Sequence, residues 1–167
     1  MQMVGRRQMP RRRRGHTTQV TIGGESFTLI AAAGDDGLLS DVVMQWGKHG
    51  TATSGLMDLY AMALTIAVRH HVPLAELIAE HRNLYFVPNG STDDPDIPRV
   101  RSVIDWVVRR LALDWLPYEE RTKLGLFTLR EQLDAAAKSM NEEASMRPVP
   151  AQGLDTTWWV SATTIGA

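Results

Sequence analysis

The chain contains no cysteine among its 167 residues. This absence excludes disulfides, thiolate metal sites and any chemistry that needs a thiol nucleophile or a redox-active dithiol. It also makes a reducing cytoplasm the expected location. No apolar run reaches the length of a membrane-spanning helix, and no apolar segment accompanies the arginines near the N-terminus as a secretory signal would require. The hydrophobic content of 44% and the charged content of 22% fit one folded domain with tails.

Acidic residues are missing from positions 1–14, which hold six arginines and therefore carry a charge of +6. The rest of the chain holds 12 basic and all 19 acidic residues, for a charge of −7. Such an arm can bind nucleic acid through phosphate contacts, or a partner, with Arg11, Arg12, Arg13 and Arg14 as the contact residues. It can equally be a solvated end or a linker inherited from a longer parent protein. Since no aromatic residues interleave the arginines, we favour a basic disordered arm over residues 1–16, with weak nucleic-acid binding at most.

Alternation of polar and apolar residues predicts three strands after this arm. Residues 19–22 alternate, the glycine pair at 23–24 is typical of a two-residue hairpin turn, and the alternation continues over 26–30. An Asp-Asp-Gly turn at 35–37 precedes a segment, 38–46, that is rich enough in Val and Leu to form a third strand. We expect a small antiparallel three-stranded meander, which needs a helix to cover its apolar face.

Residues 55–68 include only two polar side chains. A helix that is apolar nearly all round is usually a buried one. We therefore expect a buried helix over 54–71, in contact with both the meander and a second long helix. Thr53 or Ser54 is the expected cap at its start, and Pro73 ends the segment.

The second long helix is predicted from Pro98 to Leu116, after a short helix at 74–81 and a turn-rich connection. Its inward stripe repeats at three- and four-residue steps and comprises Val100, Val103, Ile104, Val107, Val108, Leu111 and Trp115. Trp106 lies off this stripe beside arginines. It either marks an interface with a partner or packs under a neighbouring loop, and the sequence leaves both open.

The C-terminal part begins with a short helix at 118–125 that ends on a glycine. Thr128 and Glu131 form a capping box, which starts a helix with a narrow apolar stripe. The paired Trp158 and Trp159 in the tail must either fold back onto the domain or be covered by something else. The expected fold class is α+β, with four parts: the arm 1–16, an α+β domain 17–126, a C-terminal helix 127–146 and a flexible tail 147–167.

The best candidate for a ligand site is a glycine-rich junction between the third strand and the buried helix. Free backbone donors at a helix N-terminus attract anions such as nucleotide phosphates. The residues of this possible anion or nucleotide site are Gly47, Lys48, Gly50, Thr51, Thr53 and Ser54. The alternative is that the glycines permit a tight turn and the hydroxyls cap the helix.

Nothing in the sequence points to a catalytic or metal site. His70 and His71 are adjacent, whereas two ligands on one helix face need a three- or four-residue spacing. No serine, histidine and carboxylate spacing suggests a triad. We therefore expect no catalytic residues and no metal.

A series of motifs runs in order through residues 19–126. They are Gly47-Lys48-His49-Gly50-Thr51, Ser54-Gly55-Leu56-Met57-Asp58, His71-Val72-Pro73-Leu74, Thr92-Asp93-Asp94-Pro95-Asp96-Ile97 and Arg109-Arg110-Leu111-Ala112-Leu113-Asp114-Trp115-Leu116-Pro117. In this order they resemble the TSCPD segment near the C-terminus of adenosylcobalamin (vitamin B12)-dependent class II ribonucleotide reductases. The resemblance covers about two thirds of the chain.

The resemblance implies less than the activity of that family. There the radical chemistry belongs to a large barrel that precedes this segment and carries the catalytic cysteines and the cobalamin. The cysteine of the TSCPD motif has no counterpart near Thr51–Ser54, and Tyr85-Phe86-Val87-Pro88 stands where the family has Arg-Phe-Glu-Pro.

We therefore expect a stand-alone accessory domain linked to deoxyribonucleotide synthesis, with no cofactor of its own and inactive alone. Its expected partners are a ribonucleotide reductase catalytic chain, nucleotides or a second copy, with no membrane. The alternative is a non-enzymatic adaptor that binds nucleic acid or a protein through the arginine arm and exposed tryptophans.

Overall fold

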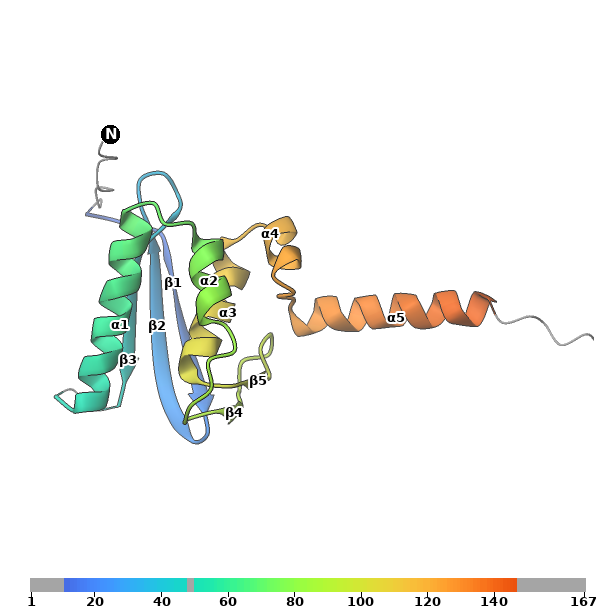
Figure 1. The fold of residues 1–167 in the computed structure, drawn as a ribbon, viewed down its shortest axis with the longest axis horizontal. Helices are drawn as coiled ribbons and strands as arrows, with labels where there is room; N and C mark the ends of the chain where they lie inside the picture. The colour runs from blue at the N-terminus through green and yellow to red at the C-terminus, as the bar shows by residue number, and fades with distance from the viewer. Residues whose placement is uncertain (1–10, 48–49, 147–167) are drawn as a thin grey trace, which may run out of the picture. The chain divides into compact units, whose positions relative to one another are not determined.

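A three-stranded antiparallel sheet forms the first part of the computed structural model, which describes residues 11–47 and 50–146. Strands β1 (Gly15–Ile22), β2 (Glu25–Ala33) and β3 (Leu39–Trp46) lie in the order β1-β2-β3 (Figure 1). Gly23 and Gly24 have φ angles of 59° and 87°, as the tight turn of a two-residue hairpin requires. The predicted meander is thus confirmed, although β1 begins four residues before the alternation at 19–22.

One face of the sheet carries the core. Its buried side chains alternate along the strands and include Val20, Ile22, Phe27, Leu29, Ala31, Val42 and Met44. The register sets Leu29 opposite Met44 and Ala31 opposite Val42, so these side chains are close neighbours on the same face. Val43 and Gln45 point to the other face and are exposed. Because only one face is apolar, helices need to cover only that face.

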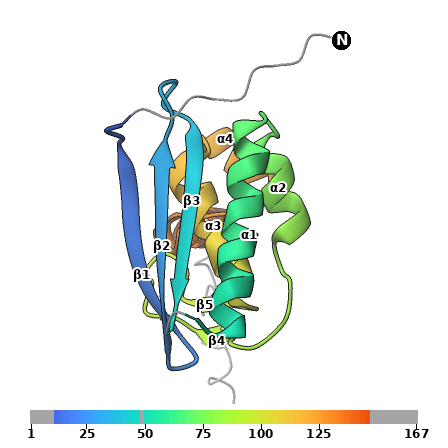
Figure 2. The same cartoon turned by 90° about the vertical axis from the view of Figure 1, so that its left-hand side faces the viewer.

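Helix α1 (Ala52–Arg69) runs alongside β3, and α3 lies behind the strands in the same view (Figure 2). The hydroxyl of Thr65 accepts a hydrogen bond from the Val42 N–H at 2.9 Å and donates one to the Val42 carbonyl at 3.1 Å. Arg69 donates to the carbonyl of Ser40 at 3.0 Å. Side chains of α1 therefore satisfy backbone groups on the outer edge of β3, which protects that edge from pairing with another strand.

The prediction that this helix is buried all round is wrong. Leu64 is buried, but Leu56, Leu59 and Ile66 are more than half or half exposed, at 71%, 67% and 50%. The physical reason is the position of α1 beside an edge strand, where the domain contacts only one side of the helix. The expected cap is also displaced: Thr51, rather than Thr53 or Ser54, occupies the N-cap position.

Helix α3 (Val103–Trp115) supplies the other large part of the core through residues such as Val103, Val107 and Leu111. The short helix α2 (Leu74–His81) packs on it through Ile78. The prediction that α3 begins at Pro98 is wrong, because two residues, β5 (Arg99–Val100), pair instead with β4 (Gly90–Ser91). Ser102 then caps the helix by accepting a hydrogen bond from the Asp105 N–H at 3.1 Å.

The described C-terminal elements are α4 (Tyr118–Lys123) and α5 (Leu129–Met146). The predicted capping box is confirmed: Thr128 N–H donates to Glu131 at 2.8 Å and Glu131 N–H donates back to the Thr128 hydroxyl at 3.1 Å. The chain divides into two units, 1–133 and 134–167, and the described part of the second is the exposed remainder of α5. Trp158 and Trp159, with the rest of the tail and residues 1–10, lie outside the described residues.

Candidate functional site

The glycine-rich junction between β3 and α1 is built as a turn and a cap. Gly47 and Gly50 have φ angles of 61° and 87°, a region that favours glycine. The Thr51 hydroxyl accepts a hydrogen bond from the Ser54 N–H at 3.1 Å, and Ser54 itself is buried. The expected turn and helix cap are therefore present. Lys48 lies outside the described residues, so the anion site at this junction stays a prediction.

The described arginines of the N-terminal arm lie just before β1. Arg13 forms an ion pair with Asp41 at 2.6 Å, and Asp41 also accepts a hydrogen bond from Arg69 at 3.0 Å. Arg11, Arg12 and Arg14 are exposed. One arginine of the arm thus binds the acidic body of its own chain, and nucleic-acid binding by the arm stays a prediction.

Trp106 is fully buried, with 0% of its surface exposed, so its use as an exposed contact residue is wrong. Its indole N–H donates to a carboxylate oxygen of Asp94 at 2.9 Å. The second alternative, packing under a loop, is what the structure shows. The predicted stripe left Trp106 out, whereas the structure includes it in the same core as Val103 and Val107.

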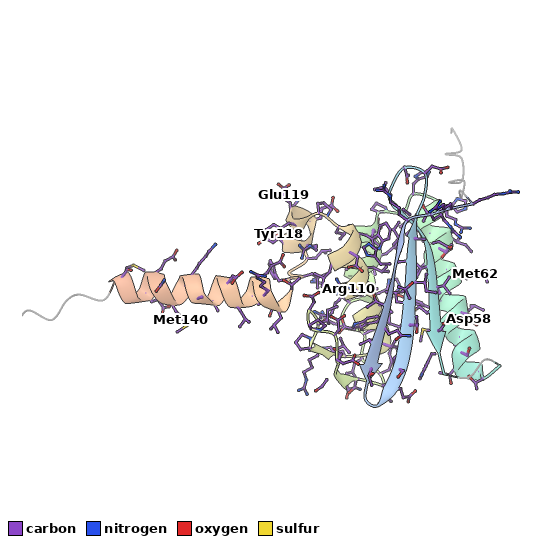
Figure 3. The ribbon with its side chains drawn as sticks, turned by 180° about the vertical axis from the view of Figure 1, so that it is seen from behind. Asp58, Met62, Arg110, Tyr118, Glu119 and Met140 are labelled. Atoms are coloured by element: carbon purple, nitrogen blue, oxygen red, sulfur yellow. The ribbon has the colours of Figure 1, made fainter. Side chains whose placement is uncertain are left out.

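A partly buried ionic cluster surrounds Arg110, whose side chain is labelled in Figure 3. Its guanidinium lies 2.6 Å from Asp114, 3.1 Å from Asp96 and 3.6 Å from Asp94. Burial alone would lower the pKa of Arg110, but hydrogen bonds to Asp114 and Asp96 outweigh it and raise the pKa. The cluster joins the segment 94–96 to α3, and its charges are engaged in holding the fold together.

A second polar centre forms at Asp105, which has 0% exposure. Its carboxylate accepts hydrogen bonds from the Asn83 N–H at 2.8 Å, the Arg101 N–H at 3.0 Å and the Arg109 guanidinium at 2.8 Å. Sequence reasoning missed this residue, although Ser102 and Asp105 have the spacing of a helix N-terminal box. Because three donors hold this carboxylate in place, its role is structural: it fixes the start of α3.

An apolar cleft of about 400 Å³ lies between the end of α1, the start of α2 and the end of α3. Val68, Val72, Leu74 and Leu116 contribute to its lining, and so does Trp115. The Trp115 indole N–H is buried without a hydrogen-bond partner among the described residues.

Over 11–47 and 50–146, no three His, Asp or Glu side chains are grouped so as to hold a metal ion. The carboxylates with the most contacts, Asp94 and Asp105, are committed to Trp106 and to the start of α3. In that part of the chain, no helix is both long and apolar enough to cross a membrane. What the geometry provides is surfaces and a cleft, which suit binding.

Comparison with known proteins identifies the family of this chain and several relatives. The TSCPD domain family matches residues 4–114. The chain is 36% identical over 127 residues to proteins of Streptomyces avermitilis and Streptomyces coelicolor, each named vitamin B12-dependent ribonucleotide reductase. It is 30% identical over 112 residues to the protein of that name from Agrobacterium fabrum.

The matches cover most of this chain but only a small part of each relative. They cover 76% of this chain but 13% of the two Streptomyces proteins, and 66% of this chain but 9% of the Agrobacterium protein. No solved structure matches the chain significantly. The relatives are thus much larger proteins, of which this chain corresponds to one segment, and the chain belongs to the TSCPD domain family.

Proposed function

We propose that this chain is a non-catalytic domain of a vitamin B12-dependent ribonucleotide reductase system and serves deoxyribonucleotide synthesis by binding the catalytic chain. The observation that carries the proposal is the 36% identity over 127 residues to proteins named as that enzyme. The identity extends over most of the described domain, which supports a shared fold with the corresponding segment of those proteins. A segment that lies within a larger catalytic chain in its relatives is suited to binding such a chain.

The non-catalytic part of the proposal follows from composition. The chain has no cysteine, so it lacks the thiol on which the reaction of the resembling family depends. The partly buried Asp114, beside Arg110, and the buried Asp105 are engaged in structural hydrogen bonds. Neither carboxylate is free to act as an acid, a base or a nucleophile.

The described residues also do not fit the cofactor of the relatives. The cleft at Trp115 has a volume of about 400 Å³, within the range of about 300 to 1,000 Å³ that is typical of drug-sized ligands. A cobalamin is much larger than such a ligand. We therefore assign no cobalamin site to this part of the chain and no reaction step to the cofactor.

Size-exclusion chromatography tests the binding function. The purified full chain is mixed with a purified vitamin B12-dependent reductase catalytic chain from the same organism and run on a size-exclusion column. We expect a complex that contains both chains and withstands dilution. Separate elution of the two chains at all concentrations would contradict the proposal.

An activity assay tests the non-catalytic part independently. The chain alone, supplied with adenosylcobalamin, a dithiol and a ribonucleotide, is expected to form no deoxyribonucleotide. The catalytic chain in the same assay is the positive control. Product formation by the rigorously purified chain would show that the non-catalytic assignment is wrong, whatever the binding experiment gives.

A further inference from the structure

Helix α1 has two apolar faces, and the domain covers only one of them. The inward residues lie against the sheet and are Ser54, Met57, Ala61, Leu64, Thr65 and Val68. On the opposite side Leu56, Leu59, Met62 and Ile66 expose 71%, 67%, 59% and 50% of their surface. A water-facing helix side is normally polar. Four large apolar side chains along one helix form the kind of patch that marks an interaction site.

The outer face has the spacing of a helix–helix seam. Its positions advance by four, three, four, three and four residues, and they are Ala52, Leu56, Leu59, Ala63, Ile66 and His70. This alternation is the heptad pattern by which two helices pack side by side. We refer to these six residues as the α1 seam. The seam extends over the whole of α1, which runs alongside β3 (Figure 2).

The seam is almost free of charge. The positions that flank it are Thr53, Tyr60 and Ala67 on one side and Gly55, Met62 and Arg69 on the other. Arg69 is the only Asp, Glu, Lys or Arg among them, and it is already bonded to Asp41 and Ser40 of its own chain. In helix pairs, charged residues at the flanking positions form salt bridges that determine which partner a helix binds. A seam without them fits a partner whose surface is equally uncharged.

We propose that the α1 seam binds the α1 seam of a second copy of this chain in antiparallel orientation, an inference that goes beyond the proposed reductase function. With the two-fold axis at the level of Ala61, Leu59 faces Ala63 of the other copy and Leu56 faces Ile66. Large side chains thus meet small ones in the middle. A parallel pair would set Ala63 against Ala63 and leave a gap. The antiparallel arrangement also pairs helix dipoles favourably.

The size of the seam sets the strength of the dimer. An 18-residue helix is about 27 Å long, and a single helix pair of that length buries less area than the roughly 1,200–2,000 Å² of a standard stable interface. The dimer is therefore in reversible equilibrium with monomer. Leu59 lies near the centre of the seam, where residues that dominate binding energy gather.

Sedimentation equilibrium of the full chain tests the proposal. We expect a monomer–dimer equilibrium in the wild type and, for Leu59→Glu, a dimer Kd raised by about 30-fold or more. Val87→Glu is the matched control, since Val87 is 79% exposed on a loop away from the seam, and it should dimerise like wild type. The melting temperature of Leu59→Glu at low concentration should equal that of the wild-type monomer, because the exposed side chain supports no core.

Two results would overturn the proposal. One is a chain that is monomeric at every concentration. The other is a dimer that survives Leu59→Glu but is lost in Leu133→Glu, since Leu133 on α5 is also exposed, at 61%, and would then mark the true interface. Binding to the reductase catalytic chain is measured separately, so failure of self-association leaves the proposed function unaffected.

Crosslinking tests the orientation, and the absence of native cysteine makes each introduced thiol unique. The antiparallel pairing sets Ala52 of one copy beside His70 of the other, both exposed at the ends of the seam. A mixture of Ala52→Cys and His70→Cys chains should form a disulfide between the two variants, whereas each variant alone should not. Crosslinking of Ala52→Cys with itself would instead show a parallel pair and refute the proposed arrangement.

Discussion

Replacing Thr65 with valine removes two hydrogen bonds and leaves a side chain of nearly the same shape. The Thr65 hydroxyl satisfies both the N–H and the carbonyl of Val42, at 2.9 and 3.1 Å. Both residues are buried, with 8% and 3% exposure, so water cannot easily take the place of the hydroxyl. The substitution therefore tests whether α1 stabilises the edge of β3 through this contact.

The expected loss follows from the two backbone groups that the Thr65→Val variant leaves unpaired. A buried donor or acceptor without a partner costs about 1–3 kcal/mol, and the valine regains part of this because it has no hydroxyl to bury. We expect a net destabilisation of about 2–4 kcal/mol, a large share of the 5–15 kcal/mol that is typical of a domain. Helix propensity contributes little, since Thr and Val have similar values.

Urea denaturation followed by far-UV circular dichroism measures this loss. Thr65→Ser keeps the hydroxyl and loses one methyl group, so it should cost only about 1 kcal/mol. Thr53→Val, on the exposed side of α1, should leave the midpoint nearly unchanged. The reasoning would be refuted if Thr65→Val were as stable as Thr65→Ser, because the two hydrogen bonds would then contribute nothing.

Three further predictions follow from buried contacts and one exposed cap. Leu64→Ala should destabilise the domain by about 2–5 kcal/mol in urea titration, as large-to-small core changes do. Ile66→Ala should cost far less stability because Ile66 is half exposed. Equal losses of stability would contradict the orientation of α1. Trp106→Phe removes the donor to Asp94 and should cost about 1–3 kcal/mol, seen as a lower melting temperature; an unchanged melting temperature would show that the bond is dispensable. The pKa of Glu131 is lowered by its hydrogen bond to an arginine, so its contribution to stability is present above the unfolded pKa of about 4.3 and is lost as pH falls through the folded value. Glu131→Gln should therefore flatten the acid side of the melting-temperature profile, and a profile parallel to wild type would oppose this.

Local patterns were sufficient to predict the meander, the glycine turn at 23–24 and the capping box at Thr128, because each depends on residues near one another in sequence. The orientation of α1 was beyond such patterns. Its apolar residues surround the helix, and periodicity alone does not show that the sheet stops at β3 and that one side faces outward. That side could be recognised only once Leu59 and Ile66 were placed.

The candidate site shows the same limit. The cap at the junction depends on Thr51 and the neighbouring glycines, and a hydroxyl cap there was foreseen to within three residues. The sequence could not decide between the two positions of Trp106, because the segment around Asp94 that covers it is a loop without periodicity. The pair of Arg110 and Asp114 has the four-residue spacing of a helix ion pair, but the approach of Asp96 depends on how that loop closes.

The order of the elements along the chain also bears on how the domain assembles. Each contact from β1 to β2, from β2 to β3 and from β3 to α1 joins neighbours in sequence, and the bond between Val42 and Thr65 closes only 23 residues. Contacts between nearby residues close small loops and form quickly. Helix α3 reaches the sheet only after the chain has passed through α2 and β4–β5. We therefore expect the meander and α1 to form first. In stopped-flow refolding, the fluorescence change of Trp106, isolated by subtraction of the Trp106→Phe trace, should lag behind the circular dichroism signal. Simultaneous changes would argue against this order.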